Sequence, residues 1–230
     1  MLTDVTSCVR WTSTGEDCSA LRPFRAMERQ VHGLITLGSL ATPRIMPTHD
    51  SKIEIVPYDP GWPGAFEAEA VRPRAALQTL ALRIDHHGST AIPGVGAKPI
   101  IDIQLSVAEL QPLSAYGARL EAIGYVHVPH PDDSFCPFFH RPIQWPHSHH
   151  VHVVERGGRE ERRTLAFRDY LRDHPSVARE YEDLKRTLAA RIVAADPESQ
   201  ERYAVAKTDL IERVVALAVA RGYPRDWSDQ

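Results

Sequence analysis

The feature that most constrains this chain is a single carboxylate inside an apolar strand pattern. Residues 99–105 read Pro-Ile-Ile-Asp-Ile-Gln-Leu. Side chains alternate between the two faces of a strand, so the apolar residues point one way while Asp102 and Gln104 point the other. An ionised carboxylate in a dry core costs on the order of several kcal/mol unless it is paired or binds a cation. We therefore expect this face to line a cleft, with an exposed sheet face or a salt bridge to Arg168 as the alternatives.

The loop before this strand is rich in glycine and carries a lysine near its end. It begins Gly88-Ser89-Thr90 and reaches Lys98 just before the strand. Glycine lets the backbone approach a ligand closely, and backbone N–H groups supply positive dipoles for phosphate oxygens. The spacing matches neither G-x-G-x-x-G nor G-x-x-x-x-G-K-[ST], which excludes the dinucleotide-binding and P-loop motifs. We predict that Gly88, Ser89, Thr90 and Lys98 bind a ligand; the alternative is a plain connecting loop.

The composition is that of an ordinary globular protein. The chain has 230 residues, of which 43% are hydrophobic and 25% charged, so it can bury a core. Its net charge of −3 gives no general attraction for nucleic acid or for an acidic membrane surface. Three cysteines without framework spacing argue against a disulfide scaffold, and the sequence shows neither a membrane-spanning apolar run nor a signal sequence. These features predict a cytoplasmic protein.

The pattern along the chain predicts one folded domain between two appendages. Residues 1–50 are expected to be a flexible or loosely docked extension, 51–222 the domain, and 223–230 a tail. Strand patterns come first and helical periodicity last, which predicts an α+β fold: a mixed β-sheet with helices packed on one side and a C-terminal helical hairpin. Strands are predicted at 52–56, 82–87, 99–107, 125–128, 138–140 and 149–155, and helices at 63–82 (kinked or split at Pro73), 113–123, 177–192 and 198–221.

Several segments of the chain resemble the GrpB family, a branch of the nucleotidyltransferase superfamily. They occur in matching order between about residues 52 and 221: VPYDPGW at 56–62, HGSTAIPG at 87–94, AKPIIDI at 97–103, HVHVV at 150–154, LAFRDYLR at 165–172, YEDLK at 181–185 and YAVAK at 203–207. The resemblance implies a nucleotidyltransferase-like fold in which Gly88 and Ser89 hold nucleotide phosphates while acids, beginning with Asp102, bind Mg²⁺. Such ions stabilise the charge on a transferring phosphate.

The sequence departs from the superfamily pattern at two of its three acids. That pattern places acid-x-acid on the strand after the Gly-Ser turn and a third acid on a neighbouring strand. Asp102 matches the first acid, but Gln104 occupies the second position, and the strand expected to carry the third has His150 and His152. A neutral amide binds Mg²⁺ weakly, since hard cations prefer charged oxygen ligands. We take Asp102, Gln104 and His152 as the candidate catalytic residues, with Mg²⁺ at Asp102.

The two histidines give this region a second kind of chemistry. His150 and His152 share one strand face, about 7 Å apart, and the resemblance places them beside the Asp102 strand. There they can contact a phosphate, or they can bind a transition metal together with Asp102. A structural role within the strand is the alternative. We predict that His150 binds the ligand and that a transition metal is the alternative to Mg²⁺.

Two further basic residues are candidates for binding a phosphate. Lys207 falls on the apolar stripe of the last helix, one turn from Tyr203, so it either extends along the edge of the stripe to solvent or binds a phosphate at the cleft. Arg168 can pair bidentately with a carboxylate or with a phosphate. The charged run at 160–163 is predicted to be a solvated helix start.

These residues support three functions. The first is binding of a nucleotide, or of another phosphate-bearing small molecule, with Mg²⁺ and with transfer of a nucleotidyl group to an unidentified acceptor. The second is a catalytically degenerate nucleotide-binding or protein-interaction module, which Gln104 and the missing third acid favour. The third is a hydrolase that depends on a histidine-bound metal.

Overall fold

The strands form one mixed sheet. The computed structural model describes residues 53–192 and 197–225, so the predictions for residues 1–50 lie outside the described part. The strands are β1 (Arg83–His87), β2 (Ile101–Val107), β3 (Val126–Val128), β4 (Phe138–Arg141) and β5 (His149–Glu155). They are ordered β1-β2-β5-β4-β3. β2 and β5 run parallel and the other neighbours antiparallel, which confirms the mixed sheet.

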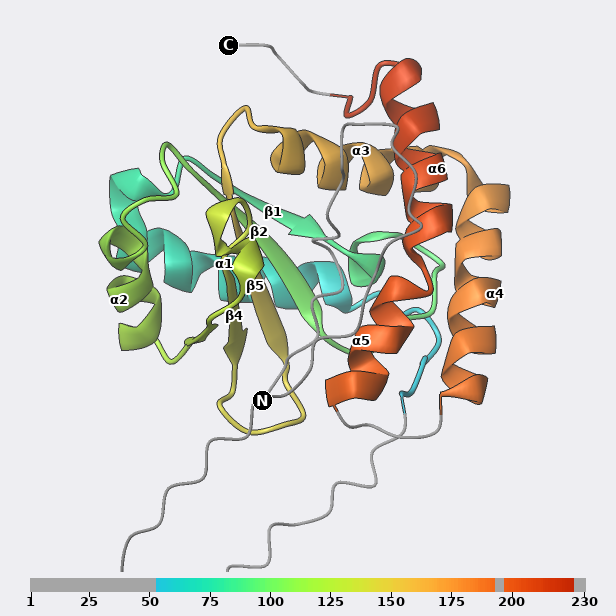
Figure 1. Ribbon diagram of the computed structural model, residues 1–230, viewed down its shortest axis with the longest axis horizontal. Helices are drawn as coiled ribbons and strands as arrows, with labels where there is room; N and C mark the ends of the chain where they lie inside the picture. Colours follow the sequence, from blue (N-terminus) through green and yellow to red (C-terminus); the bar gives the residue numbers. More distant parts are fainter. Residues whose placement is uncertain (1–52, 193–196, 226–230) are drawn as a thin grey trace, which may run out of the picture. The chain divides into compact units, whose positions relative to one another are not determined.

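The helices of the described part fall into two groups along the chain. α1 precedes the first strand and α2 lies between β2 and β3, whereas the other four follow β5 without a further strand, as the C-terminal helical periodicity predicts. Figure 1 shows their arrangement. The helices are α1 (Trp62–Leu77), α2 (Ser114–Ala122), α3 (Arg159–Asp173), α4 (Pro175–Arg191), α5 (Pro197–Val205) and α6 (Thr208–Ala220), with short 3₁₀ helices η1 (Gln78–Leu80), η2 (Ser89–Ala91) and η3 (Pro131–Ser134).

α1 and α2 cover one face of the sheet. Their apolar side chains share a cluster with the odd-numbered residues of β2 and β5; Phe66 and Leu120 come from the helices, and Ile103 and Val151 from the strands. Ile103, Val151 and Leu120 are fully buried. The alternation predicted for the strand 99–107 is therefore confirmed on its apolar side, and its polar side faces the opposite way.

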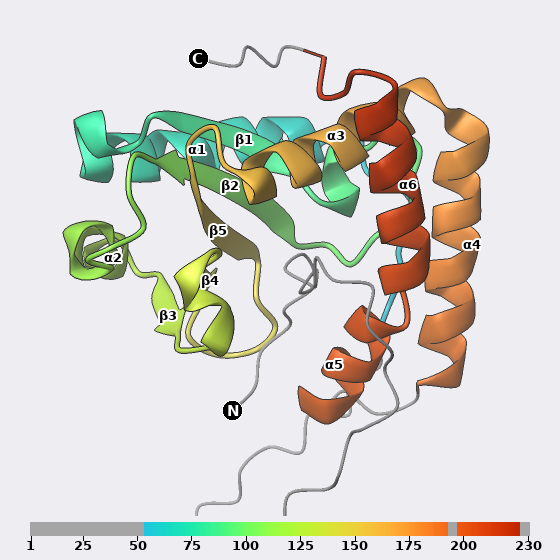
Figure 2. The ribbon, with the colours of Figure 1, turned by 45° about the horizontal axis from the view of Figure 1, so that its top comes forward.

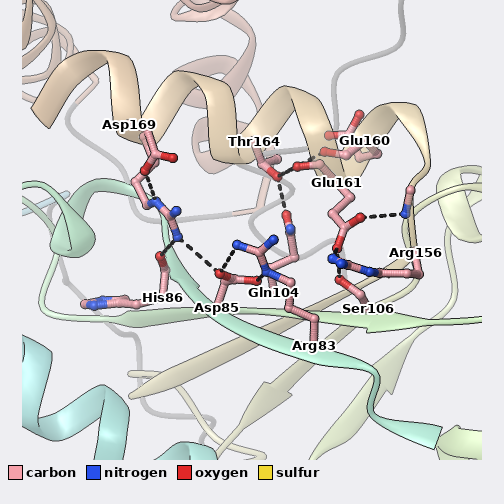
Figure 3. A network of polar contacts seen from close by, with 12 residues as sticks. Arg83, Asp85, His86, Gln104, Ser106, Arg156, Glu160, Glu161, Thr164 and Asp169 are labelled. Carbon is pink, nitrogen blue, oxygen red and sulfur yellow. Dashed lines mark hydrogen bonds and ion pairs between the residues drawn. The ribbon is translucent and has the colours of Figure 1, made fainter. Parts of the chain in front are cut away.

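α3 covers that opposite face through polar contacts. Ser106 of β2 donates a hydrogen bond of 2.6 Å to the Glu161 carboxylate, and Thr164 donates one to Gln104 Oε1. Figure 3 shows both contacts between the helix and the sheet. The α+β class is confirmed, but helices lie on both faces of the sheet instead of on one. The reason is that polar residues of a helix, and not solvent, cover the polar side of β2.

A second apolar cluster joins α3, α4 and α6. It includes Tyr170, Tyr181 and Val214, and Ile92 from the loop after β1 packs into it. α4 and α6 lie side by side and run in opposite directions in Figures 1 and 2, which confirms the helical hairpin. No helix in the described ranges is both long enough and apolar enough to cross a membrane.

Four local predictions differ from the structure. The helix predicted at 198–221 is divided in two, because α5 ends at Val205 and α6 begins at Thr208. The described residues of the strand predicted at 52–56 form no strand, because Val56 makes only an isolated bridge with Ala97. α1 is not split at Pro73, which is buried; a proline inside a helix removes one backbone hydrogen bond, and the helix continues on both sides of it here. The start of α3 is not solvated, since Glu161 is 0% and Arg163 is 7% exposed.

Candidate functional site

A cavity lies between one end of the sheet and the C-terminal helices. Strands β2 and β5, the turn after β1, and helices α4 and α5 all contribute to its lining. Of the ten site residues predicted from the sequence, eight line this cavity: Gly88, Ser89, Thr90, Lys98, Asp102, His150, His152 and Lys207. The structure therefore brings most of the predicted site together, from segments that lie more than a hundred residues apart in the sequence.

The turn at Gly88 holds its backbone against Asp102. The β1–β2 register pairs His87 with Asp102, so the residue after His87 meets the carboxylate. Gly88 has a φ of +68° and a ψ of −169°, and a β-carbon at this position would overlap the Asp102 carboxylate. The next residue, Ser89, lies 3.3 Å through its Oγ from the hydroxyl of Tyr181 on α4. A glycine is therefore required where turn and carboxylate meet.

Two imidazoles from β5 approach the Asp102 carboxylate. The parallel register places His150 beside Asp102 and His152 beside Gln104. His150 Nδ1 is 3.2 Å and His152 Nε2 is 3.9 Å from Asp102 Oδ1. Burial raises the pKa of Asp102, but the hydrogen bond and the charge of His150 outweigh this effect, so the pKa lies below its usual range. The carboxylate is thus held as an anion at the cavity wall.

Further histidines pack against His150 and His152. His147 Nδ1 lies 3.3 Å from His150 Nε2, and the rings of His147 and His140 are stacked with centroids 3.8 Å apart. The ring of His87 meets that of His152 edge-on at 4.9 Å. Burial lowers the pKa of His147 to about 3 and that of His87 to about 4. Both rings are therefore neutral at pH 7.

Three lysines from separate segments converge on the cavity. Lys98 comes from the glycine-rich loop, Lys185 from α4, and Lys207 from the residue before α6. Lys185 and Lys207 are only 2% and 3% exposed. Each lies over the ring of a tyrosine one turn earlier in the chain, with Nζ 4.6 Å from the centroid of Tyr181 and 4.2 Å from that of Tyr203, respectively. Burial lowers the pKa of all three lysines to about 7, and the charge of Lys207 adds to this effect at the other two.

Gln104 and Arg168 do not line the cavity. Gln104 is fully buried and accepts its hydrogen bond from Thr164 of α3, so it does not reach the position of a second metal-binding acid. Arg168 donates to the backbone oxygen of His86 at 3.0 Å and to Asp169 at 2.7 Å. Both residues join the sheet to α3, which corrects their predicted places in the ligand site.

Four polar residues of the lining are not among the ten site residues chosen from the sequence: His87, Tyr181, Lys185 and Tyr203. A signal for three of them is present in the sequence, because Tyr-x-x-x-Lys occurs at 181–185 and again at 203–207. Residues four apart are neighbours on a helix, so each tyrosine supports its lysine. His87 follows from strand pairing, which becomes visible only in the structure.

Comparisons with known proteins identify the family of the chain. A family model described as "GrpB protein" matches residues 52–216. A UPF0157 protein from Pseudomonas aeruginosa is 39% identical over 174 residues, which are 74% of this chain and 69% of that protein. A UPF0157 protein from Halalkalibacterium halodurans is 37% identical over 188 residues, 81% of this chain and 89% of that protein. The crystal structure of conserved protein GrpB from Enterococcus faecalis has a TM-score of 0.64 at 30% identity, covering 73% of this chain and 98% of that chain. The chain belongs to the GrpB protein family.

Proposed function

We propose that this protein binds a nucleotide, or another phosphate-bearing small molecule, in the cavity beside the Gly88–Ser89 turn. The observation that carries the proposal is the distribution of lysine. The sequence contains 4 lysines and 23 arginines, and three of those lysines line this one cavity. Lysine is a compact charge that tolerates burial by losing its proton, whereas arginine stays charged. A site that must be positive only when an anion is bound therefore suits lysine.

The electrostatics of the cavity favour an anion. Asp102 is the only carboxylate among the residues that line the cavity in the described ranges, against three lysines. A pKa near 7 for each lysine reflects burial without a matching number of acids. Phosphate oxygens would stabilise the charged ammonium groups, because a nearby opposite charge favours ionisation. The Ser89 hydroxyl adds a neutral donor at the turn.

Transfer of a nucleotidyl group would require more than binding, and the metal ligands available in the cavity limit it. Such transfer relies on carboxylates that hold Mg²⁺ against the reacting phosphate. Within the described lining Asp102 is the one acid, and Gln104 is engaged by Thr164. One carboxylate with two imidazoles fits Mg²⁺ poorly. We therefore propose ligand binding as the function and regard nucleotidyl transfer as the less supported activity. The presence of a single carboxylate also favours a binding module that has lost catalysis.

Calorimetric titration with ATP and with inorganic triphosphate tests binding. The wild-type protein is expected to bind at millimolar concentrations or below, and Lys207→Met is expected to weaken binding by about tenfold or more, as loss of a charge-assisted hydrogen bond does. Arg202→Met is the matched control, because it removes an exposed cation from neighbouring α5. Absence of binding by the wild-type protein, or equal losses in both variants, would contradict the proposal.

A labelling experiment separates binding from transfer. The protein is incubated with nucleotides labelled at the α-phosphate and with candidate acceptors. Covalent label on an acceptor, lost in Asp102→Asn, supports nucleotidyl transfer. Saturable binding without label transfer supports a binding module that lacks catalysis.

A further inference from the structure

In the described part of the chain, Asp102, His150 and His152 form a cluster of donor atoms that could hold a metal ion. Their ligand atoms all lie within 4.8 Å of one another. A tetrahedral ion with bonds of about 2.0–2.1 Å places neighbouring donors about 3.4 Å apart. The two separations from Asp102 Oδ1, 3.2 Å to His150 Nδ1 and 3.9 Å to His152 Nε2, lie on either side of that value.

We propose that these three residues bind one divalent transition-metal ion of the Zn²⁺ class, in place of Mg²⁺. Imidazole nitrogen suits zinc, cobalt, nickel and iron, whereas Mg²⁺ demands oxygen ligands in octahedral geometry. The residue that would supply a second oxygen from β2, Gln104, is bound to Thr164 on α3. The donor set is therefore two nitrogens and one carboxylate.

Neighbouring groups fix the orientation of the His150 ring, which lies nearer to Asp102 than the His152 ring does. The parallel pairing of β2 and β5 sets His150 directly beside Asp102. Its other ring nitrogen, Nε2, lies 3.3 Å from His147 Nδ1, so Nδ1 is left facing the carboxylate. Metal-binding histidines are commonly held in this way, with the second nitrogen engaged by a neighbouring polar group.

The cluster also has one open side. The side chains of His150 and His152 are 2% and 3% exposed, whereas that of Asp102 is 24% exposed, and all three residues line the cavity. Three protein ligands with a further position open to a cavity are typical of zinc sites that accept an exogenous ligand. If the cavity binds a phosphate, one of its oxygens can complete the coordination; this last step rests on the proposed function, whereas the ion site does not.

Metal titration without nucleotide tests the proposal. Protein stripped by chelator is titrated with Co²⁺, and visible absorption bands are followed, then Zn²⁺ is added as a competitor. The expected result is one equivalent of Co²⁺ that Zn²⁺ displaces and that Mg²⁺ at a thousandfold excess does not. Absence of stoichiometric binding, or displacement by Mg²⁺ at comparable concentration, would overturn the proposal.

Variants locate the ion. His152→Gln and Asp102→Asn are each expected to weaken Co²⁺ binding by a hundredfold or more. His149→Gln is the matched control: it removes the adjacent imidazole of the same strand, which is directed instead toward Arg141 and Glu69. Equal affinity in all variants would overturn the assignment. Should a variant fail to fold by circular dichroism, the wild-type competition between Zn²⁺ and Mg²⁺ still decides. Because no nucleotide is present, failure here leaves the outcome of the ATP titrations unaffected.

Discussion

The backbone of Gly88 lies against the carboxylate of Asp102 so closely that no side chain fits between them. A β-carbon at Gly88 would overlap Asp102 Oδ2, and the φ of +68° is one that other residues rarely adopt. This contact ties the turn to the acid and fixes where the cavity wall lies. The positions of Gly88 and Asp102 therefore depend on each other.

Replacing Gly88 by alanine should disrupt the contact between the turn and the Asp102 carboxylate. We expect Gly88→Ala to lower the free energy of unfolding by about 1–3 kcal/mol, because a strained φ/ψ region is forced on a residue with a β-carbon, and to weaken ATP binding as Asp102 moves. Urea denaturation and calorimetry measure the two effects. Gly64→Ala on α1 is the control, since its β-carbon meets nothing within 4 Å; the control should be neutral or slightly stabilising. A Gly88→Ala protein as stable as the wild type would refute the contact.

Glu161 is expected to be a major stabilising residue although its sequence context is highly charged. It is 0% exposed and accepts hydrogen bonds of 2.6 Å from both Ser106 Oγ and the Gly157 N–H. Glu161→Ala should lower the free energy of unfolding by about 2–4 kcal/mol, because it leaves buried donors without an acceptor.

Chemical denaturation checks the Glu161 prediction against a surface variant. Glu198→Ala removes an exposed partner of an i,i+4 ion pair with Arg202, and such pairs contribute about 0.3–0.5 kcal/mol. Similar losses of unfolding free energy in the two variants would contradict a stabilising role for buried Glu161.

Ligand affinity should fall as the pH rises from 7 to 9. Each cavity lysine has a pKa of about 7, so above that value the ammonium charges that attract a phosphate are lost while the nucleotide stays ionised. Binding of ATP should also take up protons near pH 7. Calorimetry in buffers of different ionisation enthalpy measures this uptake, and Lys207→Met should reduce it. Affinity that is constant or tightens with pH would be contrary to the account.

The stability of the ligand-free protein should change in the opposite direction over the same range. The unfolded chain has lysines of pKa 10.5, whereas the folded values are about 7, so between these limits the unfolded state binds more protons. The contribution of these lysines to the free energy of unfolding therefore rises with pH from about 7 to about 10. Denaturation of the wild type and of Lys185→Met compares the slopes; the variant should show the smaller rise, and an identical slope would speak against buried lysines.

Restoring the second acid should not restore a magnesium site. In Gln104→Glu the new carboxylate is expected to remain against Thr164 and α3, since the side chain is fully buried there. Mg²⁺ affinity, measured by calorimetry, should be the same in the variant and in the wild type. A clear gain would show that this side chain turns into the cavity.

Alternation along 99–107 was enough to predict the strand, its apolar face and the position of Asp102, because period-2 burial is a local property. The glycine turn and His150 were likewise placed correctly beside it. Gln104 was misjudged for a physical reason: a polar residue that faces a cavity and one that pairs with a polar helix have the same local pattern. Only the packing of α3, with Glu161 and Thr164 at the contact, separates the two.

The cavity lysines needed information of another kind. Lys185 lies on a helix whose partner surface is formed by a loop near Gly96, to whose oxygen it donates a hydrogen bond. No local pattern predicts that approach over such a separation in sequence. The rarity of lysine in an arginine-rich chain was the available signal, and it gains meaning once the structure shows three of them around one cavity.

A crystal structure grown with a nucleoside triphosphate tests the central claim most directly. We expect electron density for the phosphates within hydrogen-bond distance of Ser89 and of at least two of Lys98, Lys185 and Lys207. Density for the nucleotide elsewhere on the surface, with the cavity holding water alone at saturating ligand, would contradict it.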